Sequence, residues 1–153
     1  MIKGLRRVSL AVRDLAVPLA FYRDTLGLKA SAELELPERG LRLVRLAAGP
    51  AEIELMQPTG SEGAVAGFLE ARGEGPYHIA IEVDDLEVEL QTLLARGVEL
   101  IDREPRAGPS GRIAFVHPRS TGGLLVELWE APAAPPQGSS EAQAASPAAG
   151  GLP

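Results

Sequence analysis

The chain contains no cysteine and no long apolar run, and these two absences exclude disulfide-bonded and membrane-spanning proteins. Without cysteine, disulfide bonds and thiolate chemistry are excluded for these 153 residues, and a reducing compartment is the expected environment. No apolar run approaches the roughly 20 residues that a membrane span needs. The first residues lack the apolar segment typical of a signal peptide. The sequence therefore predicts a cytoplasmic protein with no membrane partner.

Positive charge and histidine are also scarce. The 15 Lys and Arg residues are outnumbered by 21 Asp and Glu residues, which gives a formal net charge of −6. This balance argues against nucleic acid as a partner. Arginines still gather at Arg103, Arg106, Arg112 and Arg119, which leaves room for one anionic ligand. The two histidines, His78 and His117, are the imidazole groups available for chemistry.

An internal repeat organises what is present. Residues 79–86 match residues 8–15 at an offset of 71 (79 − 8), and both segments alternate apolar and small or polar side chains as strands do. Asp14 and Asp85 each precede a helical pattern, which favours them as N-terminal caps. Residues 53–55 (IEL) recur as residues 126–128 (VEL) at an offset of 73 (127 − 54). Two similar modules in tandem are therefore expected.

The pattern predicts an α+β fold of two tandem β-α-β-β-β modules that share a cleft. Module one spans about 1–60, with a helix at 15–26 and strands at 8–12, 29–36, 41–47 and 51–56. A linker helix is expected at 63–72. Module two spans about 76–130, with a helix at 86–95 and further strands at 99–104, 113–116 and 124–129. Residues 131–153 are mostly Ala, Pro, Gly, Ser and Gln, and we expect a disordered tail.

The repeat makes Arg7 equivalent to His78, and Glu54 equivalent to Glu127. Each glutamate lies between apolar neighbours that face the other way, so a pseudo-twofold would bring all four side chains into one cleft. Ser9 and Ala80 are small and would leave space there. One imidazole and two carboxylates suit a divalent ion such as Zn, Mn, Co or Ni.

A simpler interpretation treats these residues as ordinary surface groups. A lone glutamate in a strand is usually on a solvated face, and a lone histidine is usually a hydrogen-bonded polar residue. A solvated face gives no reason for glutamate to recur in both modules, so the repeat favours a site at Glu54, His78 and Glu127. His117 follows a strand, and we expect a structural or substrate-rim role for it.

Several segments resemble one known family. They are residues 21–28 (FYRDTLGL), 52–55 (EIEL), 68–75 (FLEARGEG), 78–80 (HIA), 100–106 (LIDREPR), 113–118 (IAFVHP) and 120–123 (STGG). From about residue 2 to 130, the chain resembles the vicinal oxygen chelate superfamily, which has the glyoxalase fold. Within it, the segments 100–106, 113–118 and 120–123 are similar to the methylmalonyl-CoA epimerase family.

The resemblance implies a function and a set of site residues. The family interconverts the two epimers of methylmalonyl-CoA through an enolate, with one divalent metal and an acyl-CoA substrate, and we expect a homodimer. Its metal positions fall on Arg7, Glu54, His78 and Glu127, of which the last three can be ligands. The implied catalytic residues are Glu127 and Glu54, and the implied substrate-binding residues are Arg7, Arg106 and His117.

The chain departs from the family pattern at Arg7 and Leu43. The family has histidine at the first position, and arginine has no lone pair to offer a metal. Three arrangements are open: three ligands hold the metal with water, Arg7 turns outward, or its guanidinium takes the metal's place. A second base of some relatives maps near Leu43, which cannot transfer a proton. The alternatives are a glyoxalase-I-type lyase and a metal-free ligand-binding protein.

Overall fold

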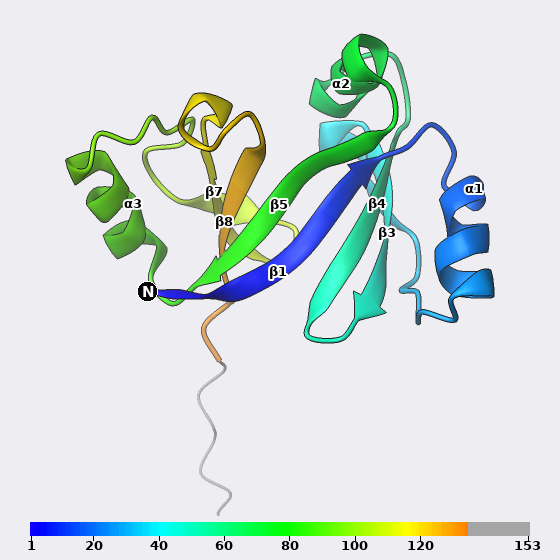
Figure 1. Cartoon of the computed structure of the whole chain (residues 1–153), viewed down its shortest axis with the longest axis horizontal. Helices are drawn as coiled ribbons and strands as arrows, with labels where there is room; N and C mark the ends of the chain where they lie inside the picture. The colour runs from blue at the N-terminus through cyan, green and yellow to red at the C-terminus, as the bar shows by residue number, and fades with distance from the viewer. Residues whose placement is uncertain (135–153) are drawn as a thin grey trace, which may run out of the picture.

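The computed structural model describes residues 1–134, which form one eight-stranded sheet with three α-helices against it (Figure 1). Residues 135–153, which hold most of the expected disordered tail, lie outside the described residues. The elements of the first half are β1 (Ile2–Ala11), α1 (Ala16–Leu19) continuing as a π-helical segment (Ala20–Thr25), β2 (Leu34–Leu36), β3 (Leu41–Ala48) and β4 (Ala51–Pro58). After α2 (Ala64–Arg72) come β5 (Gly75–Val83), α3 (Leu86–Ala95), β6 (Arg106–Gly108), β7 (Gly111–Val116) and β8 (Leu125–Glu130).

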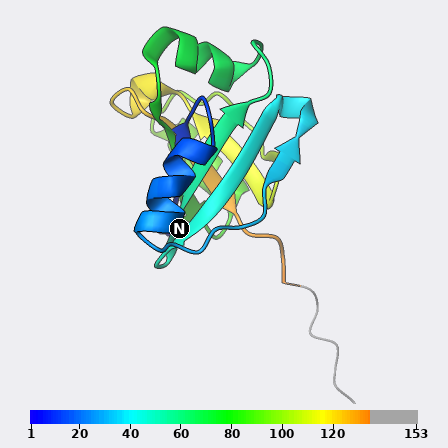
Figure 2. The ribbon, with the colours of Figure 1, turned by 90° about the vertical axis from the view of Figure 1, so that its right-hand side faces the viewer.

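The strand order is β2-β3-β4-β1-β5-β8-β7-β6, so the two halves meet at β1 and β5. These central strands run antiparallel to each other, while β1 is parallel to β4 and β5 is parallel to β8. Figures 1 and 2 show that the sheet curves instead of lying flat. The prediction of two tandem β-α-β-β-β modules is confirmed.

Some expected strands differ in extent. The segment 99–104 is not a strand: only Leu100 makes an isolated bridge, to Val116, and β6 begins later, at Arg106. Asp102 explains the break, because its carboxylate accepts the Phe115 N–H and takes the place of a ladder bond. Similarly, the expected strand 29–36 reduces to an isolated bridge at Ala30 and to β2.

Two of the helices begin beside an aspartate that accepts a backbone hydrogen bond. Asp85 is the N-cap of α3 and accepts the Val88 N–H at 2.9 Å. Its repeat equivalent, Asp14, accepts the Ala16 N–H at 2.9 Å. Gly27 and Gly97 follow the two helices with positive φ, a conformation in which glycine is unstrained. Within residues 1–134, no helix combines the length and apolar character of a membrane span.

Burial separates the two faces of the sheet. Leu15 and Leu19 pack on Leu46 and Leu55 under the first helix, and Leu86 and Leu90 form the matching cluster under α3. The third cluster joins α2 to the inner face through Val65, Leu69, Leu41, Leu43 and Met56. On that inner face, five polar residues are also buried: Arg7, Ser9, Glu54, His78 and Glu127. Burying such groups without partners costs folding free energy, so five of them together indicate a functional site.

Candidate active site

The strand register places the buried polar residues in two rows across the inner face. One row runs from Arg45 on β3 through Glu54 on β4 and Ser9 on β1 to His78 on β5. Because directly opposite residues in a sheet have Cβ atoms about 5 Å apart, neighbours in a row are within side-chain reach.

The second row crosses β1 two residues earlier. It runs from Glu52 on β4 through Arg7 and Ala80 to Glu127 on β8 and Phe115 on β7. The methyl group of Ala80 is all that separates Arg7 from Glu127 in this row. The pseudo-twofold thus pairs Ser9 with Ala80 and Arg45 with Phe115, as well as the two pairs predicted from the repeat.

These rows form the floor of a cavity of about 340 Å³. Its acidic and basic lining includes Arg7, Arg39, Arg45, Glu54, His78, Arg106 and Glu127. Its apolar wall includes Leu43, Met56, Tyr77 and Phe115. A cavity of this size, with charged groups that converge beside an apolar wall, is typical of a small-molecule site.

Glu54 has partners on both carboxylate oxygens. Oε1 accepts the Ser9 hydroxyl at 2.8 Å, and Oε2 accepts Arg45 Nε at 2.9 Å. Burial alone would raise the pKa of Glu54, but the charges of Arg7 and Arg45 and these hydrogen bonds hold the pKa below its usual value. Glu54 is therefore a paired, ionised carboxylate.

Glu127 is equivalent to Glu54 in the repeat, but it lacks the partners that Glu54 has. Ala80 stands where Glu54 has Ser9, and Phe115 stands where it has Arg45, so both hydrogen bonds are missing. Oε1 is buried and has no hydrogen-bond partner among the described residues. Burial raises the pKa of Glu127 to about 7, against the opposing charge of Arg7. A buried carboxyl group with such a pKa can take up and release a proton near neutral pH.

His78 lies beside Ser9 and Glu127. Its Nε2 is 3.1 Å from Ser9 Oγ and 3.5 Å from Glu127 Oε2. Burial lowers the pKa of His78 to about 4, so the ring is neutral. Phe115 contacts the ring edge to face, with centroids 5.6 Å apart, and fixes its orientation.

Arg7 is buried in the middle of the group, with 3% of its surface exposed. Its Nη1 lies 3.6 Å from Glu54 Oε2 and 3.8 Å from Glu127 Oε1, and its Nε lies 3.8 Å from Glu52 Oε2. Its Nη2 donates to Ser110 Oγ at 3.5 Å. Of the three arrangements open from the sequence, the structure has the guanidinium between the carboxylates.

The residues present do not fit a divalent ion with Arg7 in this position. Arg7 faces the same carboxylates that an ion would use, with Nη1 3.6 Å from Glu54 Oε2 and 3.8 Å from Glu127 Oε1. At about 4 Å and an effective dielectric constant of about 20, a divalent ion and a guanidinium repel by about 8 kcal/mol. That is most of the roughly 10–16 kcal/mol with which a full ligand set holds structural zinc. No step of the reaction is therefore assigned to a metal.

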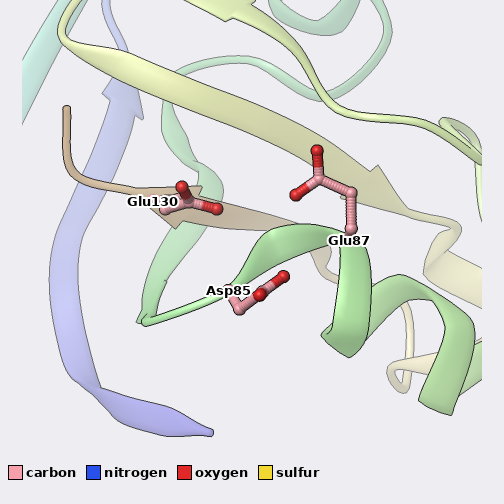
Figure 3. A group of neighbouring side chains, drawn as sticks. All are labelled: Asp85, Glu87 and Glu130. Atoms are coloured by element: carbon pink, nitrogen blue, oxygen red, sulfur yellow. The ribbon is translucent and has the colours of Figure 1, made fainter. Parts of the chain in front are cut away.

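A separate acidic group consists of Asp85, Glu87 and Glu130, whose oxygens lie within 4.8 Å of one another (Figure 3). Each carboxylate has a structural partner. Asp85 caps α3, Glu87 pairs with Arg112, and Glu130 accepts both the Leu86 N–H at 2.7 Å and Arg112 at 2.8 Å. This group ties the start of α3 to β7 and β8.

Of the two remaining expected site residues, Arg106 lies at the cavity and His117 does not. Arg106 lines the cavity, where it pairs with Asp102 at 3.2 Å and covers the Phe115 ring at 5.2 Å. His117 does not line it; its Nδ1 accepts the Arg119 N–H at 3.1 Å and caps a short 3₁₀ turn (Pro118–Ser120).

The structure adds residues that the sequence did not single out, chiefly Arg45 as the partner of Glu54 and Arg39 at the cavity. A signal for Arg45 existed: a two-residue turn at Gly49 and Pro50 pairs Ala48 with Ala51, and that register places Arg45 opposite Glu54. The hydrogen-bonding role of Ser9 follows from the same kind of register, between β1 and its two neighbours.

Comparison with known proteins gives consistent matches. Residues 6–115 match the Glyoxalase/Bleomycin resistance protein/Dioxygenase superfamily. The mitochondrial methylmalonyl-CoA epimerase of Bos taurus is 36% identical over 83% of this chain and 74% of its own length. The ethylmalonyl-CoA/methylmalonyl-CoA epimerase of Cereibacter sphaeroides is 36% identical over 84% of this chain and 98% of its own. A solved methylmalonyl-CoA epimerase in complex with methylmalonyl-CoA and NH4+ has a TM-score of 0.80 and 31% identity, covering 87% of this chain and 97% of that one.

Proposed function

The chain belongs to the glyoxalase/bleomycin resistance protein/dioxygenase superfamily, and we propose that it is an epimerase acting on methylmalonyl-CoA. The proposed reaction moves the proton on the α-carbon, between the thioester and the free carboxylate, through an enolate. Three kinds of support agree: the relatives named above, the cavity on the inner face of the sheet, and the carboxyl group of Glu127.

Glu127 is the observation that carries the proposal. It is buried, it lines the cavity, and one of its oxygens has no hydrogen-bond partner among the described residues. A general base must come within hydrogen-bond reach of the substrate proton, and a carboxylate that already accepts on both oxygens is less suited to this than one with a free oxygen. Glu127 is therefore assigned as the acid/base, and Glu54 as the anchor that holds Ser9 and Arg45 in place.

The cavity suits an acyl group that bears a carboxylate. Arg39 and Arg106 line it and offer positive charge for the carboxylate, as guanidinium groups do in bidentate pairs. Leu43 and Met56 supply an apolar wall for the methyl group. A cavity of about 340 Å³ accommodates the acyl portion, and the rest of the coenzyme would lie outside it.

The proposed chemistry needs only the residues of this chain. The C–H bond at the α-carbon breaks, its proton passes to Glu127, and the electron pair moves onto the thioester oxygen. Return of a proton to the α-carbon re-forms the C–H bond and the thioester carbonyl: Glu127 returns it to the face from which it left, and a proton from solvent on the opposite face gives the other epimer. Neutral His78, within 3.5 Å of Glu127, positions the carboxyl group without competing for the proton.

Solvent deuterium exchange at the α-carbon tests the proposal. Methylmalonyl-CoA is incubated with the protein in deuterium oxide, and loss of the α-proton signal is followed by NMR. We expect exchange well above the rate without protein. Turnover of the methylglyoxal–glutathione hemithioacetal, with no exchange of methylmalonyl-CoA, would instead support the glyoxalase-I-type lyase. Binding of the acyl-CoA without exchange would support the metal-free binding protein.

A homodimer and a cytoplasmic location are further parts of the proposal. The homodimer rests on the resemblance to a family of paired modules, and light scattering coupled to size-exclusion chromatography measures the mass directly. The location rests on the lack of cysteine, and cell fractionation tests it.

A further inference from the structure

Arg7 lies where the chemistry needs a cation. Resting on the proposed function, we propose that the Arg7 guanidinium takes the place of a divalent ion, so that this chain stabilises the enolate with a built-in organic cation. The inference starts from the misfit between the donor atoms and a metal, and from three observations on Arg7 itself.

The first observation is that Arg7 is held in place. It is buried, and the carboxylates of Glu52, Glu54 and Glu127 lie 3.6–3.8 Å from its guanidinium nitrogens. Ser110, from the turn before β7, accepts its Nη2. Contacts from β4, β8 and this turn fix the guanidinium before any charge develops nearby. Such a preorganised cation is the condition for electrostatic catalysis.

The second observation is that Arg7 still has donors to offer. Its Nε has no hydrogen-bond partner among the described residues, and its Nη1 contacts Glu54 and Glu127 at distances beyond a hydrogen bond. Because Nη1 lies beside Glu54 and Glu127 at the cavity, its N–H groups can donate to the thioester oxygen as it becomes an enolate oxygen. The proton leaves to Glu127, and the charge left on oxygen faces Arg7.

The third observation is charge balance. With Glu52, Glu54 and Glu127 ionised, their three negative charges are matched by Arg6, Arg7 and Arg45. A divalent ion added to this group would leave an excess of two positive charges. The group is complete without one, and replacement of Arg7 by a neutral ligand is what would create a need for a metal.

Metal binding tests this directly and does not depend on the reaction. Metal content is measured on protein purified without chelator, and Co²⁺ is titrated into the wild type and two variants. Arg7→His restores a ligand and removes the repelling charge, so its Co²⁺ affinity should rise by at least about 100-fold. Arg6→His adds the same imidazole one residue earlier, outside the cavity lining, and should behave like the wild type.

The expected result is wild-type protein with far less than one metal per chain and a gain of affinity confined to Arg7→His. A stoichiometric divalent ion in the wild type, or an unchanged affinity in Arg7→His, overturns the inference. Circular dichroism confirms that each variant is folded. Lack of deuterium exchange in the wild type would refute the proposed function while leaving these metal measurements to be judged separately.

Chemical rescue supplies a readout that a merely structural arginine would not move. Arg7→Ala should lose exchange and regain part of it on addition of millimolar guanidinium, because the added ion supplies the missing charge. A folded Arg7→Ala variant that keeps the wild-type exchange rate without any added cation would contradict the proposal.

Discussion

Two glutamates at equivalent positions differ because of their neighbours. Glu54 has Ser9 and Arg45 beside it and is a paired carboxylate, whereas Glu127 has Ala80 and Phe115 and keeps a raised pKa. The chemistry of the cleft therefore depends on four side chains that do not themselves exchange protons. A change at any of them should shift the balance between the two carboxyl groups.

Glu127→Gln should reduce the rate of deuterium exchange by about 100-fold to 10,000-fold, the usual contribution of a general acid/base. The amide keeps the size of the side chain but cannot carry the proton. Glu82→Gln is the matched control on neighbouring β5, where Glu82 pairs with Lys3 at 3.0 Å, and it should leave the rate unchanged. Equal rates for wild type and Glu127→Gln would remove the assigned role.

Glu54→Gln should cost less than Glu127→Gln in the same assay. The amide oxygen can still accept from Ser9 or Arg45, so the anchor is weakened and not lost. The expected damage is a looser Arg45 and a lower melting temperature. If Glu54→Gln reduced the deuterium exchange rate more than Glu127→Gln, Glu54 would be the acid/base and Glu127 the anchor.

At the scale of elements, β3 carries the departure with the clearest consequence. Leu43 lines the cavity on β3, which belongs to the other half of the sheet from β8, where Glu127 lies. With one acid/base at the cavity, most protons return to the face from which they left. We expect wild-type exchange to be faster than the change of configuration.

Leu43→Glu should raise the number of epimerisation events per exchange event, because it adds a second carboxyl group on the opposite half. Both quantities come from one experiment, by NMR for exchange and chiral analysis for configuration. Leu41→Glu is the matched control, two residues earlier on the same strand and also at the cavity. A wild type in which both rates are equal would mean that a second acid/base already exists.

The helix α3 gives a prediction about stability alone. Asp85→Ala removes the acceptor of the Val88 N–H and should lower the free energy of unfolding by about 1 kcal/mol. For a domain of this size, that corresponds to about 2–4 °C in melting temperature. Glu70→Ala, at an exposed position of α2, should have little effect. Calorimetry measures both, and a loss at Glu70 as large as at Asp85 would contradict the capping role.

For the whole molecule, the repeat was the most informative feature of the sequence. It predicted the two modules and the convergence of Arg7, Glu54, His78 and Glu127, because identical patterns fold alike and a pseudo-twofold brings equivalent positions together. It also gave the bounds of α3, whose cap and glycine stop are local signals.

Other features depend on long-range pairing and could not be read from single segments. The break before β6 depends on Asp102 bonding to Phe115 across 13 residues. The orientation of the Arg7 side chain depends on contacts with three separate segments, which contribute Glu52, Glu54, Glu127 and Ser110. The asymmetry between the two glutamates likewise needed the sheet register.

The central claim is that this cleft transfers the α-proton with Glu127 and Arg7 and without a metal. The most direct test is the rate of solvent deuterium exchange of methylmalonyl-CoA before and after exhaustive treatment of the protein with a chelator. The Glu127→Gln variant serves as the inactive control. The account predicts the same rate before and after chelation, no gain on adding Co²⁺ or Mn²⁺, and loss of exchange in Glu127→Gln. A rate that disappears on chelation and returns with Co²⁺ or Mn²⁺ would contradict it.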